Sequence, residues 1–155
     1  GRMATIFFQA SNVSFREVID ARLVLEPMLA RLASTQREPL QVSDHLAART
    51  STESDQAYLE TSAGFHRKIA AMSGNRILSL FSHAIEDIFH ERVIGMLFPS
   101  DKRDEVVCAH EAIAAAIAAE DPDAAERLMR EHMIEYVRYV EERYPALMDE
   151  IVTWQ

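Results

Sequence analysis

The stretch "SAGFHRKIAAMSGN", residues 62–75, has the pattern of an amphipathic helix that ends at a glycine. Its apolar residues recur at helical spacing, and Gly74 stands where helices commonly end in a left-handed turn. His66 lies at the centre of the apolar face, and Ser62 lies one turn before it on the same face. Because a buried polar ring costs free energy unless it has a partner, the stretch predicts a helix whose histidine makes an interior contact.

Helix signals continue on both sides of this stretch. Ser14 and Glu17 form the pattern of a capping box, and Asp121 followed by Pro122 is typical of a helix start. No segment combines alternating polarity with many β-branched residues, as a strand would. The predicted helices cover residues 14–35, 39–48, 55–72, 76–97, 101–119 (with Ser100 as N-cap) and 121–143, followed by a short tail helix after Pro145. The predicted fold class is therefore all-α, an antiparallel bundle of six to seven helices.

Length, charge and cysteine content limit the class of protein. The chain has 155 residues, 48% of them hydrophobic, which suits one domain with a real core. Its formal net charge of -9 repels a phosphate backbone, so the chain alone is predicted to be a poor nucleic-acid binder. A single cysteine excludes an internal disulfide, and the apolar runs are too short for a signal peptide or a membrane span. We expect a cytoplasmic protein without membrane contact.

Three of the six histidines fall on predicted core faces, one on each of three long helices. They are His66, His110 and His132. A single core histidine is usually a neutral ring bonded to a carbonyl or to another side chain. Three together permit a second interpretation, because neutral imidazoles are common ligands of divalent transition metals and three can hold Zn²⁺ with positions left open.

Arg22 stands on the core face of the first predicted helix, where an apolar residue is expected. A buried guanidinium needs an anionic partner, and its planar fork suits a carboxylate. That partner is either Glu26, one turn later on the same helix, or an anionic ligand in the interior. A third alternative is that the side chain extends to the surface.

Three blocks of sequence resemble one known family. "ARLVLEPMLARLA" (21–33), "FHRKIAAMSGNRIL" (65–78) and "AHEAIAAAIAAEDPDAAERLMREHM" (109–133) are similar to the FCD domain. This is the C-terminal effector-binding domain of the FadR subfamily of GntR transcription regulators. The resemblance covers roughly residues 18–140 with the blocks in family order, and it implies a helical bundle around a small-molecule cavity.

The resemblance also implies a metal site. Many FCD domains hold a metal, commonly Zn or Ni, by three histidines and one Asp or Asn. The histidines carry over onto His66, His110 and His132. The family's D-x-x-F-H reads S-A-G-F-H here, so Ser62 occupies the position of the fourth ligand, and a neutral hydroxyl is a weaker ligand than a carboxylate. In the family a first-helix arginine often meets the carboxylate of a small organic acid, and that role maps onto Arg22.

The function implied is ligand sensing without catalysis. Residues 1–13 are expected to be a linker or a cloning remnant, and residues 14–155 the FCD-like domain. The family's N-terminal winged-helix DNA-binding part is absent from the sequence, so DNA contact is expected only through such a domain. A homodimer is expected because the family pairs two DNA-reading domains.

Two other functions remain open at this point. A helical-bundle metalloenzyme would use a three-histidine metal to activate water, but it needs a general base. Glu111 adjoins His110 yet points about 100° away around a helix of 3.6 residues per turn, and Ser62 is not a base. The other alternative is a dimerisation module with a degenerate pocket. The sequence names neither the effector nor the genes that such a regulator would control.

Overall fold

The structure is a computed structural model that describes residues 12–36, 55–93 and 102–151. The side chains of residues 55, 56, 59 and 90–93 lie outside that description. So do the predicted helix at 39–48, the predicted end of the fourth helix at 97, and most of the predicted linker at 1–13.

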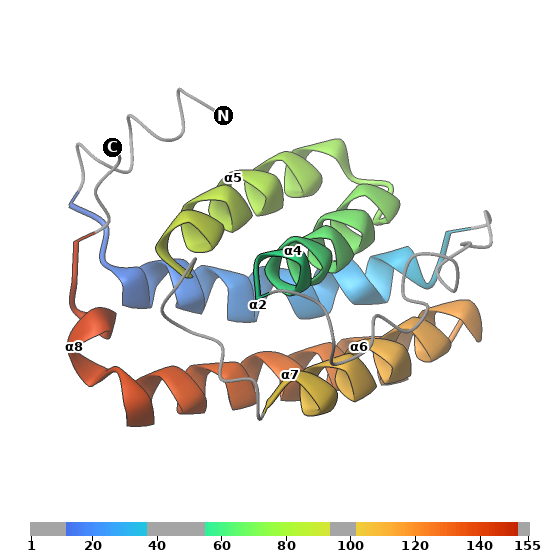
Figure 1. The fold of residues 1–155 in the computed structure, drawn as a ribbon. Helices are drawn as coiled ribbons and strands as arrows, with labels where there is room; N and C mark the ends of the chain where they lie inside the picture. Colours follow the sequence, from blue (N-terminus) through green and yellow to red (C-terminus); the bar gives the residue numbers. More distant parts are fainter. Residues whose placement is uncertain (1–11, 37–54, 94–101, 152–155) are drawn as a thin grey trace.

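Six helices, and no strands, make up the described residues (Figure 1). They are α2 (Phe15–Ala33), α4 (Asp55–Met72), α5 (Arg76–Val93), α6 (Arg103–Ala118), α7 (Pro122–Arg143) and α8 (Pro145–Met148). The all-α prediction is confirmed. No helix among the described residues is long and apolar enough to cross a membrane.

At three places the helix ends lie where the capping and stop residues of the sequence predict them. Ser14 and Glu17 form the predicted capping box at the start of α2. The side chain of Asp121 accepts a hydrogen bond from the Ala124 amide at the start of α7. After α4, Gly74 has φ +69°, and a Cβ added there would lie 2.7 Å from the amide oxygen of Gln36. A side chain at Gly74 would therefore be strained and crowded.

One predicted helix start is wrong. The sequence placed the N-cap of the fifth helix at Ser100, which lies outside the described residues. In the structure α6 begins at Arg103, and its N-cap is Lys102, whose side chain makes no capping hydrogen bond. Its ammonium instead pairs with Glu105 in the first turn, at 2.6 Å.

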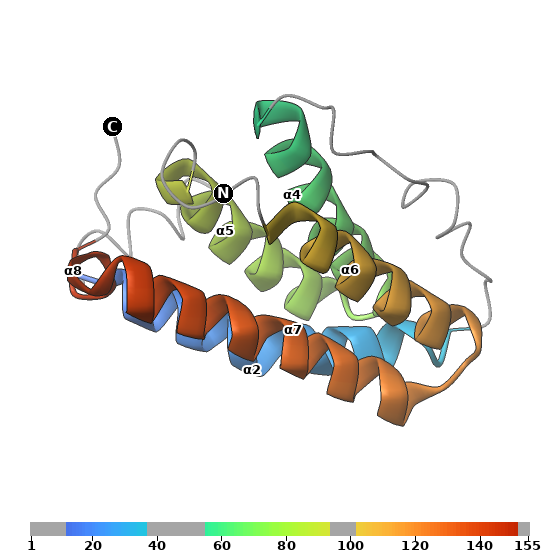
Figure 2. The ribbon, with the colours of Figure 1, turned by 60° about the horizontal axis from the view of Figure 1, so that its bottom comes forward.

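Helices α2 and α7 run antiparallel side by side (Figures 1 and 2). Ion pairs join both ends of this contact: Arg16 to Glu141 at 2.9 Å, and Arg31 to Asp123 at 2.5 Å. Helices α4 and α5 form a second antiparallel pair that packs on α2, and α6 packs on α7. Figure 2 shows α7 and α2 together along one side, with α4, α5 and α6 on the other. Helix α2 thus contacts each of the other five helices that the structure describes.

The core has two apolar clusters. The first contains Phe15, Val18, Ile19, Tyr58, Ile85, Ile88, Phe89, Val140, Leu147 and Met148. The second contains Leu29, Ala30, Ala33, Phe65, Ile69, Ala70, Ile113, Ala114, Ala116, Ile117, Ala125, Met129 and Met133. Along α2, polar residues stand between the two.

We call that set the polar layer. Its members are Arg22, Glu26, His66, Glu86, His110 and His132, and all but His132 are at most 6% exposed. Burying such groups costs free energy unless they are paired, so their contacts decide what the interior of the bundle can do.

The buried face of α7 differs from the sequence prediction. The spacing favoured Ala125, Leu128, His132, Tyr136 and Tyr139 as the core face. The fully buried residues are Ala125, Met129, Met133 and Val140. Beyond Ala125 the predicted face is only half-buried. Helix α7 packs between α2 and α6, and the face that it buries there is the neighbouring one that carries Met129 and Met133.

Candidate metal centre

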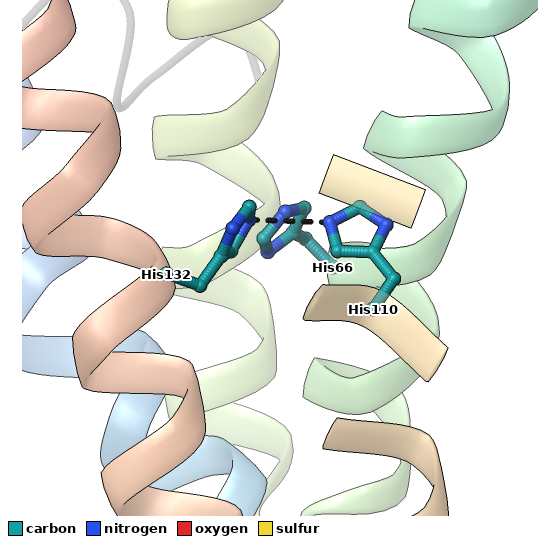
Figure 3. A group of neighbouring side chains, drawn as sticks. All are labelled: His66, His110 and His132. Atoms are coloured by element: carbon teal, nitrogen blue, oxygen red, sulfur yellow. Dashed lines mark hydrogen bonds between the residues drawn. The ribbon is translucent and has the colours of Figure 1, made fainter. Parts of the chain in front are cut away.

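The three predicted histidines lie together in the interior, on three different helices (Figure 3). One ring nitrogen from each of His66 on α4, His110 on α6 and His132 on α7 lies within 4.8 Å of the corresponding nitrogens of the other two. Nε2 of His110 lies 3.2 Å from Nε2 of His132. Figure 3 shows the ring of His66 beside the line that joins these two atoms.

Ring packing holds the cluster in place. Phe65 stacks on His110, with ring centroids 4.0 Å apart and planes 20° from parallel. The rings of His66 and His132 are nearly parallel at 5.5 Å, and His110 meets both of them edge to face. Since Phe65 belongs to the second core cluster, the imidazoles are fixed from the apolar side.

The surroundings keep two of these imidazoles neutral. Burial lowers the pKa of His110 well below its ordinary value, and the neighbouring His132, His66 and Arg22 lower it further. Burial and the nearby His66 lower the pKa of His132 to about 3. A metal binds only the unprotonated nitrogen, so both rings are ready to act as ligands at neutral pH.

A buried carboxylate from α2 reaches the cluster. Oε2 of Glu26 is in hydrogen-bonding contact with Nδ1 of His66, 40 residues away in the sequence. Burial alone would raise the pKa of Glu26, but the charge of Arg22 and the hydrogen bonds from His66 and Arg22 lower it to about 2. Glu26 therefore stays ionised in the interior.

The sequence prediction included Glu26 only as a partner of Arg22 and not as a residue of the site. The helical spacing of α2 could have indicated that Glu26 is buried. Glu26 shares the core face of α2 with the buried Val18, Arg22, Leu29 and Ala33. Glu86 on α5 was missed in the same way, since it follows the buried Ser82 at helical spacing and precedes the buried Phe89.

Arg22 is paired with both carboxylates. Its Nε donates to Oε1 of Glu26 at 2.5 Å, and its Nη2 lies 3.0 Å from Oε2 of Glu86. Its guanidinium carbon stands 3.8 Å from the centre of the Phe89 ring. The Glu26 pair is the first of the alternatives that the sequence left open, and burial excludes the third, in which the side chain reaches the surface. Burial raises the pKa of Glu86, and Arg22 opposes that shift.

The spacing of His110 and His132 fits a shared metal ion. Two nitrogen ligands at 2.0–2.1 Å from a tetrahedral zinc lie about 3.3 Å apart, close to the 3.2 Å between His110 and His132. The same distance also suits a hydrogen bond between two neutral rings, in which one Nε2–H donates to the other. Among the His, Cys, Asp and Glu side chains that the structure describes, these three form the one group of three or more suited to an ion.

Comparison with known proteins identifies the family. The family model of the FCD domain matches residues 17–135. The chain belongs to the FCD domain family. The resemblance predicted from the sequence blocks is thereby confirmed.

One curated relative also matches this FCD chain. It is the uncharacterized HTH-type transcriptional regulator YcbG of Bacillus subtilis (strain 168), 29% identical over 135 residues. The match covers 86% of this chain and 55% of the relative, so the chain spans about half the length of that protein. No solved structure matches the chain. The FCD family and this relative, a transcriptional regulator by name, favour a domain without enzymatic activity over the metalloenzyme alternative.

Ser62 remains the departure from the family's ligand pattern. It is half-buried on α4, one turn before His66. The FCD resemblance puts an Asp or Asn at this position, so the three histidines here lack the ligand that the family pattern supplies from α4. Whether Ser62 itself meets a metal stays a prediction.

Proposed function

We propose that this FCD domain is the effector-sensing part of a transcription regulator of the GntR family, FadR subfamily. It binds a small organic acid at a metal held by His66, His110 and His132. The observation that carries the proposal is the meeting of three imidazole nitrogens within 4.8 Å inside the bundle. Family membership and the transcriptional-regulator relative support the sensing role.

Zinc and nickel are the proposed metals. Imidazole nitrogen suits both, and the neutral state favoured for His110 and His132 is the state that binds. With three protein ligands, positions stay open for water or for an oxygen of the acid. When bound, the ion would act as the electrophile that attracts the effector's carboxylate.

Arg22 is the second proposed contact of the acid. Its Nη1 takes part in neither of the pairs with Glu26 and Glu86, so the guanidinium can add a third anionic partner. The contact chain Arg22–Glu26–His66 links this residue to the histidines. An acid that meets both the metal and Arg22 would therefore be held at two ends of one polar layer.

Binding would act on the bundle as a whole. The polar layer draws side chains from α2, α4, α5, α6 and α7, so a ligand there contacts five helices at once. A ligand shifts the population toward whichever arrangement of these helices binds it better, and by no more than its difference in affinity. In the regulator that shift would re-aim DNA-binding domains outside this sequence, since the chain itself carries a net charge of -9.

A homodimer is the proposed assembly, in the cytoplasm. Large apolar side chains are exposed on the outer faces of α2 and α5: Val24 is 70% exposed, Ile77 62%, Leu80 56% and Phe81 50%. An exposed apolar surface of this kind suits a second copy of the chain.

A thermal-shift screen tests the sensing function. Small mono- and dicarboxylates are added to the zinc-loaded protein and to the same protein after chelation. The proposal expects at least one acid to raise the melting temperature of the loaded protein and to have little effect after chelation, since binding stabilises the folded state by mass action. A screen in which no acid acts on the loaded protein would instead favour a dimerisation module with a degenerate pocket.

A further inference from the structure

Glu26 makes two buried contacts with opposite ends of its carboxylate. Oε2 contacts Nδ1 of His66, and Oε1 accepts from Nε of Arg22 at 2.5 Å. All three side chains are at most 6% exposed. A carboxylate held from both sides in this way has one orientation, and it points at one nitrogen of one histidine.

The contact decides which nitrogen of His66 is left for a ligand. An ionised carboxylate only accepts hydrogen bonds, so it places the proton of a neutral imidazole on Nδ1. Nε2 then carries the lone pair. Histidines that bind metals usually donate their other ring N–H to a carboxylate, carbonyl or water, which fixes the tautomer and raises the basicity of the ligand nitrogen.

Glu26 itself is not one of the grouped ligands. Among the described His, Cys, Asp and Glu side chains, the group able to share an ion contains the three histidines and not Glu26. Both of its oxygens are already engaged, one by His66 and one by Arg22. Oε2 of Glu86 lies 3.0 Å from Nη2 of Arg22. This second pair holds the guanidinium in place, and the guanidinium in turn orients Glu26.

We propose that Glu26 is the positioning residue of the metal centre. It holds His66 as the Nδ1–H tautomer, so that Nε2 is the ligand, and the Arg22–Glu86 pair holds Glu26 in place. In this chain the carboxylate near the site comes from α2 and positions a ligand. In the family pattern the carboxylate stands on α4, at the position of Ser62, and is itself a ligand. This inference rests on the proposed metal function.

The test uses the whole chain and two measurements. Nitrogen-15 NMR of the histidine rings reads the tautomer of His66 in the metal-free and zinc-loaded protein. Calorimetric titration with Zn²⁺ compares wild type, Glu26→Gln and Glu86→Gln. The two variants are matched, because each removes one buried carboxylate charge from Arg22, but only Glu26 touches a histidine.

The proposal expects a proton on Nδ1 of His66 in both forms of the wild type. It expects Glu26→Gln to weaken zinc binding about 10–100-fold, the usual effect of losing such a supporting group, and Glu86→Gln to weaken it by no more than about threefold. Glu26→Asp, which keeps the charge, should recover part of the loss. A proton on Nε2, zinc bound through Nδ1, or equal losses in the two glutamine variants would overturn it.

Failure of the inference and failure of the proposed function give different results. Wild-type protein that takes up no metal contradicts the metal function, while the tautomer of metal-free His66 still tests what Glu26 does. If Glu26→Gln does not fold, the tautomer in the two wild-type forms decides the inference by itself.

Discussion

Nε2 of His110 and Nε2 of His132 lie 3.2 Å apart, on two helices joined by a short turn. The turn at residues 119–121 folds α7 back along α6, which brings residues 22 apart in the sequence face to face. His66 completes the group from α4, and its Nδ1 contacts Glu26. The bundle therefore places one ring nitrogen from each of three helices next to one another in its interior, where a shared cation could bind them.

Acid should destabilise the metal-free protein through these histidines. His110 and His132 have lowered pKa values in the folded state, the second about 3, whereas an unfolded histidine titrates near 6.5. Between these values the unfolded chain binds more protons, so the free energy of unfolding falls as the pH falls below about 6.5. Each group contributes up to about 1.4 kcal/mol per pH unit in that window.

Two carboxyls modify this pH profile. The raised pKa of Glu86 acts in the opposite direction, because its folded form takes up a proton as pH falls toward that pKa. Glu26, with a pKa near 2, adds to the loss only below about 4.5. Urea unfolding of chelated protein from pH 7.5 to 4.5 measures the slope. The His132→Asn variant should show a shallower fall, and a stability that is flat or rises toward pH 4.5 would refute the assignment.

Restoring the family's carboxylate at position 62 should tighten metal binding. Ser62→Asp puts an anionic oxygen one turn before His66 on α4, and we expect an increase in affinity of about tenfold or more, the scale of effects seen for groups around metal sites. Ser62→Ala is the control, since it removes the hydroxyl and adds no ligand. Calorimetry in which the Asp variant binds zinc no more tightly than wild type would show that position 62 does not face the ion.

Arg22 should matter for folding and for the effector in separable ways. Arg22→Ala leaves Glu26 and Glu86 buried without their shared cation, which should cost about 3–5 kcal/mol of stability. Arg22→Lys keeps the charge and should retain most of the fold, yet it loses the planar fork that a carboxylate prefers.

The lysine variant therefore isolates the contact with the acid. Titration of an acid found in the screen should give an affinity at least about tenfold weaker for Arg22→Lys than for wild type, if Arg22 meets the acid directly. Equal affinities would leave Arg22 with its structural role alone, as the partner of Glu26 and Glu86.

The outer face of α5 should carry the contact between two copies. Phe81→Glu puts a charge among the exposed Ile77, Leu80 and Phe81, and should convert the dimer to a monomer in light scattering at micromolar concentration. Ala115→Glu, at an exposed position on α6, is the control and should stay dimeric. A wild-type monomer, or a Phe81→Glu dimer, would place any interface elsewhere.

Local signals in the sequence predicted the helices well. The capping box at Ser14, the start at Asp121 and Pro122, and the stop at Gly74 are read from side chains within a few residues of the helix end. The start of α6 was predicted wrongly because Lys102 offers no acceptor that would mark an N-cap.

The site was predicted in part. Helical periodicity put His66, His110 and His132 on inward faces, and the structure brings them together. The pairing of Glu26 with His66 depends on how α2 crosses α4, which no local pattern contains. A charged residue four positions after Arg22 also reads as an ordinary surface ion pair, and only tertiary packing buries it.

Zinc titration of the histidine variants tests the central claim most directly. Wild type is compared with His66→Ala, His110→Ala and His132→Ala by calorimetry, with the metal content checked by mass spectrometry. His83→Ala is the control, since this half-buried α5 histidine lies 3.3 Å from the Arg67 carbonyl and outside the cluster. The account predicts a single ion per wild-type chain, unchanged binding in the control, and losses on the order of 100-fold for each of the other three. Wild-type protein that binds no zinc or nickel, or cluster variants that bind as tightly as wild type, would contradict it.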